Sequence, residues 1–83
     1  MNIKDQFRQF IADNFSYDIT EIGDDTELLE ADIIDSTGVM ELVFFIADEF
    51  GFEADAEDIV PENFNSIDGL ANFVLSRTAV SVA

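Results

Sequence analysis

The amino-acid sequence predicts an all-α fold, a small bundle of three main helices plus one short helix. Apolar residues recur every three or four positions in three segments, at about residues 3–14, 36–50 and 67–77, which is the spacing of an amphipathic helix. The chain has 83 residues and no cysteine, so one efficient core must hold it together without disulfides. An apolar share of 48%, with nine phenylalanines, suits such a core.

Each predicted main helix has one apolar face. The faces consist of Ile3, Phe7, Phe10 and Ile11; of Val39, Leu42, Val43, Ile46 and Phe50; and of Ile67, Leu70, Ala71 and Val74. Gly51 is well placed to end the second helix, because glycine readily adopts the left-handed conformation that ends many helices. Ser66 can cap the last helix.

The segments between these helices are less regular. Residues 15–35 show no sustained periodicity, and so long a connection in a small domain is commonly functional. We expect its apolar residues to pin it to the core. Residues 55–59 suit a short turn of helix, which Pro61 should stop. We assign residues 1–76 to a single domain and residues 77–83 to a flexible C-terminal tail.

The charge balance is strongly acidic, with 19 acidic residues, three basic residues and a formal net charge of −16. Such a surface repels nucleic acid and anionic lipid, and it favours partners with basic docking patches. No apolar run approaches the roughly 20 residues that span a bilayer, and no signal peptide is visible. We therefore expect a cytoplasmic monomer without nucleic-acid partners or stable membrane association.

The absence of cysteine and histidine removes the usual nucleophile and base pairs and the zinc sites built on these residues. A carboxylate-pair hydrolase would need a cleft between two opposed acids, for which so small a domain has little room. The acidic clusters could collect divalent cations weakly, but none has the glycine and terminal glutamate of a calcium-binding loop. The sequence therefore predicts neither an enzyme nor a dedicated metal site.

The segment Asp35-Ser36-Thr37-Gly38 places a hydroxyl where the irregular acidic connection becomes an apolar helix. Serine is a preferred N-cap, so we expect Ser36 to cap this helix with its side chain outside the first turn. The partial positive charge of a helix N-terminus suits a phosphate ester. Ser36 is therefore a candidate attachment point, with an ordinary helix cap as the alternative.

Further motifs surround this serine. They are Leu28-Leu29-Glu30-Ala31-Asp32-Ile33-Ile34-Asp35-Ser36, Val39-Met40-Glu41-Leu42-Val43, Phe50-Gly51 and Pro61-Glu62-Asn63-Phe64-Asn65-Ser66-Ile67. Together they closely resemble the acyl carrier proteins and their peptidyl and D-alanyl carrier relatives. The resemblance implies that a phosphopantetheinyl transferase attaches 4′-phosphopantetheine from coenzyme A to Ser36, beside Asp35 and Thr37. The thiol of that arm would carry an acyl or aminoacyl group as a thioester.

The resemblance also implies partners: an adenylating ligase or acyltransferase that loads the cargo, and downstream synthases or transferases that use it. We expect them to dock on a second apolar stripe of the helix at 36–50 and on its acidic flank. This docking strip consists of Thr37, Met40, Glu41, Phe44, Asp48 and Glu49. Exposed methionine and aromatic residues ringed by charge are typical of interaction sites. Packing of Phe44 into the core is the alternative.

Many carriers shelter an acyl chain among their helices. If this chain does so, the expected lining is Leu28, Leu42, Ile46, Ile59, Ile67 and Ala71. A plainly packed core is the alternative, and the many phenylalanines favour it, or a cargo too short or too polar to need shelter.

Two features depart from the commonest fatty-acid carrier pattern. Thr37-Gly38 follows the serine where leucine is usual, and Ala47 lies in a stretch that is usually more acidic. Residues 33–36 and Gly38 are more similar to stand-alone acyl or aminoacyl carriers. We therefore expect a dedicated biosynthetic pathway, with housekeeping fatty-acid synthesis as the alternative. An acidic protein that binds divalent cations or mimics nucleic acid is the alternative of another class.

Overall fold

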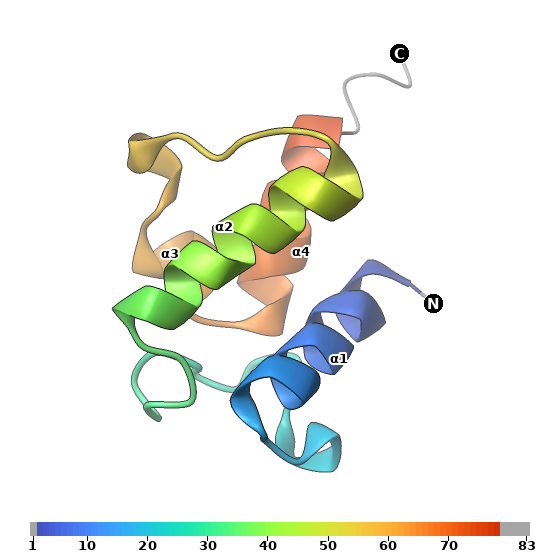
Figure 1. The fold of residues 1–83 in the computed structure, drawn as a ribbon, viewed down its shortest axis with the longest axis vertical. Helices are drawn as coiled ribbons and strands as arrows, with labels where there is room; N and C mark the ends of the chain where they lie inside the picture. The colour runs from blue at the N-terminus through green and yellow to red at the C-terminus, as the bar shows by residue number, and fades with distance from the viewer. Residues whose placement is uncertain (1, 79–83) are drawn as a thin grey trace.

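The computed structural model describes residues 2–78, which fold into helices and connections without a strand. The elements are α1 (Ile3–Phe15), the 3₁₀ helix η1 (Ile19–Glu21), α2 (Ser36–Phe50), the 3₁₀ helix η2 (Ala56–Asp58), α3 (Pro61–Phe64) and α4 (Ile67–Thr78) (Figure 1). The all-α prediction with three main helices is confirmed. No helix within the described range is both long and apolar enough to cross a lipid bilayer.

Local caps determine where the main helices begin and end. The Asn2 side chain accepts a hydrogen bond from the first turn of α1 at 2.9 Å, and α1 ends at Ser16, whose φ of 53° is left-handed. α2 ends at Gly51 with a φ of 77°, as the sequence predicted. The Ser66 hydroxyl oxygen accepts a hydrogen bond from the Gly69 N–H at 2.9 Å, as expected of a cap for α4.

The short helical elements differ from the prediction around Pro61. The predicted turn at 55–59 is present as η2, but Pro61 begins α3 instead of only stopping the segment before it. Proline is well tolerated at the first helical position, because its missing N–H would have no intrahelical partner there. α4 continues to Thr78, past the predicted domain end at residue 76. Residues 79–83 of the predicted tail lie outside the described residues.

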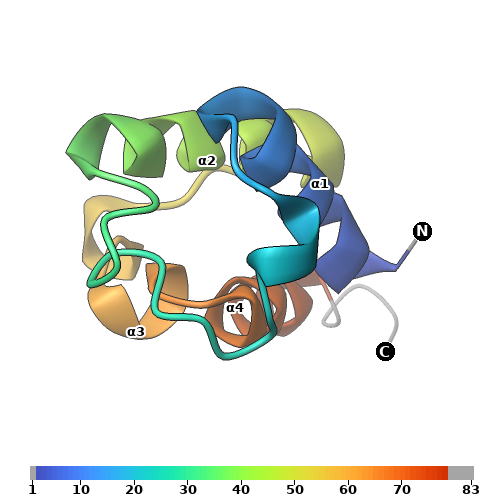
Figure 2. The ribbon, with the colours of Figure 1, turned by 90° about the horizontal axis from the view of Figure 1, so that it is seen from below.

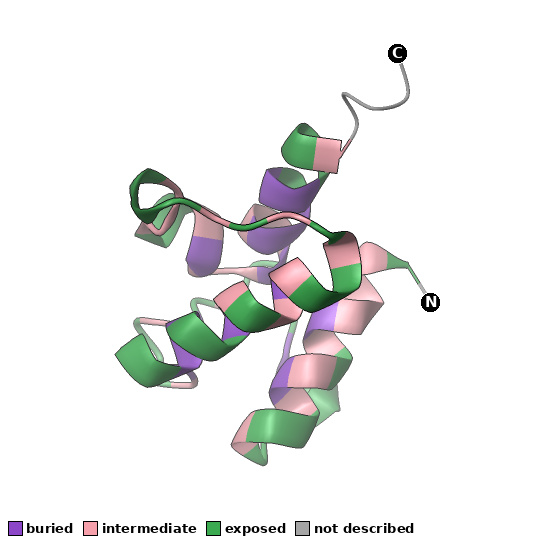
Figure 3. Ribbon diagram, turned by 45° about the horizontal axis from the view of Figure 1, so that its top comes forward, coloured by how far each residue is buried: buried purple, intermediate pink, exposed green. Residues whose placement is uncertain are grey.

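The helices pack around one core. Figure 2 shows α2 on one side of the molecule and α3 and α4 on the other. α4 contacts each of the other three α-helices, and α1 also packs against α2. The buried faces of the helices point inward (Figure 3). The largest fully buried side chains are Phe7, Phe64, Ile11, Leu28, Ile34, Leu42, Ile46, Ile67, Leu70 and Val74. Burying each one contributes about 1.5–3 kcal/mol relative to exposing it.

The connection between α1 and α2, residues 16–35, is pinned to this core, as predicted. Its Ile22, Leu28 and Ile34 are at most 2% exposed. Asn65, between α3 and α4, holds the middle of the connection. Its backbone oxygen accepts a hydrogen bond from the Leu28 N–H at 2.7 Å, and its side-chain oxygen accepts one from the Leu29 N–H at 2.8 Å. The segment that leads into α2 is therefore a fixed part of the fold.

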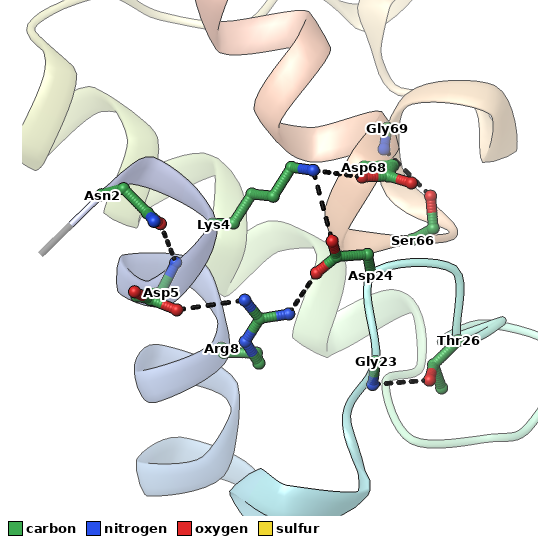
Figure 4. Close-up of polar contacts among 10 residues, drawn as sticks. All are labelled: Asn2, Lys4, Asp5, Arg8, Gly23, Asp24, Thr26, Ser66, Asp68 and Gly69. Carbon is green, nitrogen blue, oxygen red and sulfur yellow. Dashed lines mark hydrogen bonds and ion pairs between the residues drawn. The ribbon is translucent and has the colours of Figure 1, made fainter.

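A cluster of ion pairs, which we call the clamp, ties α1, this connection and α4 together (Figure 4). Lys4 Nζ lies 2.8 Å from a carboxylate oxygen of Asp68 and 3.3 Å from one of Asp24. Arg8 binds Asp24 as well, and it lies 3.0 Å from a carboxylate oxygen of Asp5. The hydrogen bonds from Arg8 and Lys4 lower the pKa of Asp24. Lys4 and Arg8 thus hold the Asp24 carboxylate of the 16–35 connection in place.

Candidate functional site

α2 is capped by Asp35, one residue before the predicted cap. Asp35 Oδ1 accepts a hydrogen bond from the Gly38 N–H at 2.9 Å, and the Asp35 backbone oxygen accepts one from the Val39 N–H at 2.9 Å. Ser36 is the first helical residue, so the prediction that it caps the helix was wrong. Aspartate and serine are equally good caps, so the preference of the single residue does not distinguish them; in the structure Asp35 has the extended backbone of a cap and Ser36 is already helical.

Ser36 is exposed at this helix end, and its hydroxyl takes part in no hydrogen bond of residues 2–78. Asp35 uses the N–H groups of Gly38 and Val39, so the N–H groups of Ser36 and Thr37 lie beside the hydroxyl without an intrahelical partner. The helix N-terminus carries about half a positive charge. A phosphate diester on the Ser36 oxygen therefore fits the local electrostatics and hydrogen-bonding capacity.

A groove of about 490 Å³ opens beside Ser36, between α2, the end of the 16–35 connection and α3. It is mostly apolar and is lined by Leu29, Asp32, Ile34, Asp35, Ser36, Val39, Met40, Ile59, Val60, Pro61 and Phe64. Asp32 adopts a left-handed φ of 63°, which aspartate tolerates better than most residues. The volume falls in the range of pockets that hold small organic ligands.

The residues expected to shelter an acyl chain lie elsewhere. Ile59 alone among them lines this groove. The others are at most 1% exposed inside the packed core, and they are Leu28, Leu42, Ile46, Ile67 and Ala71. Sequence reasoning missed the groove residues Val39 and Pro61. The helical period, which places Val39 one turn after Ser36, was the signal that could have found the first of them.

The docking strip predicted on α2 is exposed along its length. Met40 is 46% exposed and Phe44 is 67% exposed, so the alternative that Phe44 packs into the core is wrong. The remaining members, Thr37, Glu41, Asp48 and Glu49, are also exposed. By contrast, the next residue, Phe45, is half-buried and stacks on Phe10 of α1 with ring centroids 4.3 Å apart. The docking role itself stays a prediction.

The surroundings of Ser36 offer little to activate its hydroxyl. The titratable side chains of the groove are the carboxylates of Asp32 and Asp35, and the chain contains no histidine. General-base catalysis needs a positioned base whose pKa is close to the working pH. We therefore expect the base to come from another protein. Within residues 2–78, no group of three acidic side chains is arranged to hold a metal ion.

A protein-family model described as a phosphopantetheine attachment site matches residues 5–74. The match spans most of the chain, so the chain belongs to this family of phosphopantetheine-binding carrier proteins. Such carriers are not catalysts. They hold 4′-phosphopantetheine covalently and depend on a phosphopantetheinyl transferase and on enzymes that load and process the cargo. No curated protein sequence matches the chain.

Proposed function

We propose that Ser36 is the residue that receives 4′-phosphopantetheine from coenzyme A. The strongest support is the position of its exposed hydroxyl in the first turn of α2, at the edge of the groove. In the transfer, the Ser36 oxygen bonds to the phosphorus next to pantetheine and the pyrophosphate P–O bond breaks. Adenosine 3′,5′-bisphosphate leaves, and the serine proton passes to a base of the transferase. The chain supplies a positioned nucleophile.

The neighbours of Ser36 have separate roles in this proposal. Asp35 holds the first turn in place through its bonds to Gly38 and Val39. The N–H groups of Ser36 and Thr37 then face the phosphate oxygens, where the helix dipole favours negative charge. These residues orient and stabilise the attached group without taking part in bond making.

The arm, in this proposal, carries an acyl or aminoacyl group as a thioester for a dedicated biosynthetic pathway. The closed core argues for a short or polar cargo, because the residues that could shelter a long chain are packed against one another. The open apolar groove beside Ser36 is in the size range of pockets that hold small organic groups, so it can take the arm or a short acyl group. A carrier for housekeeping fatty-acid synthesis is the second candidate.

Partner enzymes would dock on the docking strip. α2 contains no basic residue, and its exposed Met40 and Phe44 lie among carboxylates. A basic patch on an adenylating ligase, an acyltransferase or a downstream enzyme matches this surface. The cytoplasmic location expected from the sequence is part of the proposal.

Intact-mass measurement tests the attachment. After incubation with coenzyme A, Mg²⁺ and a broad-specificity phosphopantetheinyl transferase, the protein should gain the mass of one phosphopantetheine group. Ser36→Ala should gain none, because the nucleophilic oxygen is gone. Ser76→Ala, which removes the hydroxyl of another exposed helical serine, one that donates to the Phe73 backbone oxygen, should gain as much as the wild type. A gain that survives Ser36→Ala would contradict the proposal.

The mass of the group that hydroxylamine releases from protein purified from its own cells tests the cargo. A short acyl or aminoacyl hydroxamate supports the dedicated pathway. A long-chain acyl hydroxamate supports the second candidate instead.

A further inference from the structure

The connection between α2 and α3, residues 51–60, forms part of one wall of the groove beside Ser36 (Figure 1). Its last two residues, Ile59 and Val60, line the groove, and Phe64 of α3 continues the wall. Phe64 is only 1% exposed, so it separates the groove from the packed core. The position of this connection therefore sets how wide and how deep the groove can be.

One ion pair joins this connection to α4. Arg77, in the last turn of α4, binds the carboxylate of Asp58 in η2. Within residues 2–78, every other hydrogen bond of residues 51–60 reaches a residue at most five positions away in the chain. The Arg77–Asp58 pair is therefore the single polar contact that holds the connection to a distant part of the fold.

Both partners of the pair are fixed by further contacts. The Asp58 carboxylate accepts a hydrogen bond from the Asp55 N–H at 3.0 Å, and the Asp58 backbone oxygen accepts one from the Asn63 side chain at 2.8 Å. The Arg77 guanidinium lies 5.3 Å from the centre of the Phe73 ring, within cation–π range. The pair thus bridges two ordered segments, and the side chain of Asp58 is only 16% exposed.

Phe73 of α4 links the pair to the groove. Its ring contacts Phe52 of the connection edge-to-face, with centroids 5.7 Å apart, and it contacts Phe64 at 5.9 Å. Phe52 is half-buried, whereas Phe73 is 5% exposed. An outward movement of the connection would therefore uncover Phe73 and Phe64 and widen the groove toward the core. Connections with few long-range contacts open locally in this way at the lowest cost in free energy.

The basic residues of the chain hold both connections that border the groove. Lys4 and Arg8 belong to the clamp, which secures the 16–35 connection, and Arg77 secures the other connection. The chain has only these three basic residues against 19 acidic ones. Its few ion pairs thus lie where they keep the walls of the groove in place.

We propose that Arg77 and Asp58 are specificity-determining residues for the cargo, because their ion pair holds the 51–60 connection against α4 and keeps the groove too small for a long acyl chain. The inference rests on the proposed attachment at Ser36 and deepens it by naming a limit on the cargo. Without the pair, the connection opens more often, and a long chain attached through Ser36 enters the widened groove.

The chain length of the cargo decides how much it gains from an open groove. Each further methylene group that leaves water stabilises the open form, so a long acyl chain shifts the population toward it. A short acyl or aminoacyl group has little apolar surface to bury and gains nothing from the opening. The closed groove therefore favours short or polar cargo, as the proposed function requires.

Amide hydrogen exchange measures the opening on protein without any attached group. Arg77→Gln should speed exchange at residues 58–64 about two- to fivefold, the range expected for loss of a partly exposed ion pair. Arg77→Lys, which keeps the cation, should retain most of the protection. Lys4→Gln is the matched control, because Lys4 is 40% exposed and Arg77 39%, but Lys4 is paired in the clamp. It should leave exchange at residues 58–64 unchanged.

The limit on the cargo is tested on acylated protein. A broad-specificity transferase with acetyl- or dodecanoyl-coenzyme A should place one acylated arm on the wild type and on Arg77→Gln, which intact mass verifies. In the wild type, the two acylated forms should have the same thermal midpoint. In Arg77→Gln, the dodecanoyl form should have the higher midpoint, because the long chain is buried in the widened groove. Acylated Lys4→Gln should behave as the wild type does.

Three results would overturn the inference. Unchanged exchange in Arg77→Gln, or an increase that is equally large in α1, would show that the ion pair does not hold the connection. A dodecanoyl group that raises the midpoint equally in the wild type and in Arg77→Gln would show that the pair does not limit the cargo. Failure to acylate Ser36 would instead contradict the attachment, and with it the limit on the cargo, whereas the exchange measurement would still test the ion pair.

Discussion

Acidic side chains are paired with cations in the clamp but not on the exposed face of α2. In the clamp, Asp24 and Asp68 each contact a cation, and these ion pairs join three segments that are distant in sequence. On α2, Glu41, Asp48 and Glu49 lie on a helix without a basic residue. Two cations, Lys4 and Arg8, are thus enough to join the long connection and the last helix to α1. The remaining negative charge faces solvent, where a basic partner can use it.

The two regions also differ in packing. Where α4 begins, Gly69 lies against the backbone of α3 so closely that a side chain would not fit. On α2, Met40 and Phe44 are exposed and contribute little to the core. We infer that substitutions near the start of α4 change stability, whereas substitutions on the α2 face change binding. Four predictions test this contrast, and they follow in order of expected effect.

Gly69→Ala should lower the free energy of unfolding by about 2 kcal/mol, because overpacking a closed site costs about 1–3 kcal/mol. A Cβ atom at residue 69 would lie 2.6 Å from the backbone oxygen of Glu62. Urea denaturation measures the change. Gly23→Ala, whose Cβ would make only ordinary contacts, and Phe44→Ala should each change it by less than about 0.5 kcal/mol. Similar losses in all three variants would remove the contrast.

Asp35→Ala should lower the free energy of unfolding by about 1 kcal/mol, the usual cost of losing an N-cap. The Gly38 N–H loses its acceptor, and the first turn that carries Ser36 becomes less ordered. We therefore expect slower phosphopantetheine transfer as well, measured by the time course of the mass gain. Asp35→Ser, which keeps a capping oxygen, should retain most of both properties. Equal defects in the two variants would show that Asp35 acts by another route.

Asp24→Asn and Asp48→Asn should shift the thermal midpoint in opposite directions. Asp24→Asn removes the anion that Lys4 and Arg8 share, so the midpoint should fall. Asp48→Asn removes one negative charge from an uncompensated surface, so the midpoint should rise slightly. Both shifts should be smaller than that of Gly69→Ala, and both should shrink in high salt because the groups are exposed. Scanning calorimetry at two salt concentrations measures them, and shifts of the same sign would contradict the comparison.

The smallest effects are those of single titrating groups on the pH profile of stability. The lowered pKa of Asp24 means that its stabilising contribution is complete above its ordinary value of 3.8 and is lost as pH falls through the lowered pKa. Hydrogen bonding to Glu30, together with its repulsion, raises the pKa of Glu27 above its ordinary 4.5. That pair destabilises the fold when both groups are charged, and the penalty disappears as pH falls through the raised value toward 4.5.

The unfolding free energy should therefore rise on mild acidification toward pH 4.5 and fall below pH 3.8. Urea denaturation across this range measures the profile. Glu30→Gln should reduce the rise, and Asp24→Asn should reduce the fall. A profile that only falls on acidification would show that repulsion between Glu27 and Glu30 is not significant.

The sequence alone was sufficient to predict the helical architecture and to identify Ser36 as the candidate attachment residue. Apolar periodicity is a local property, so the faces around Phe7, Leu42 and Leu70 could be identified from spacing. Gly51 and Ser66 were correctly placed as helix boundaries, because caps depend on the conformational preferences of single residues. The acidic balance follows from counting, because 19 acidic and three basic residues fix the sign of the net charge.

Only the tertiary structure decided which of two good caps begins α2, which phenylalanines are exposed and where the groove lies. Asp35 and Ser36 have similar capping ability, and the structure shows that Asp35 is the cap, with its side chain on the Gly38 N–H. Phe44 and Phe45 are adjacent and chemically identical, yet only Phe45 meets Phe10 across the helix interface. Pairings such as Lys4 with Asp68 join residues far apart in the chain. Such contacts depend on how helices pack, and a local pattern of residues does not contain that information.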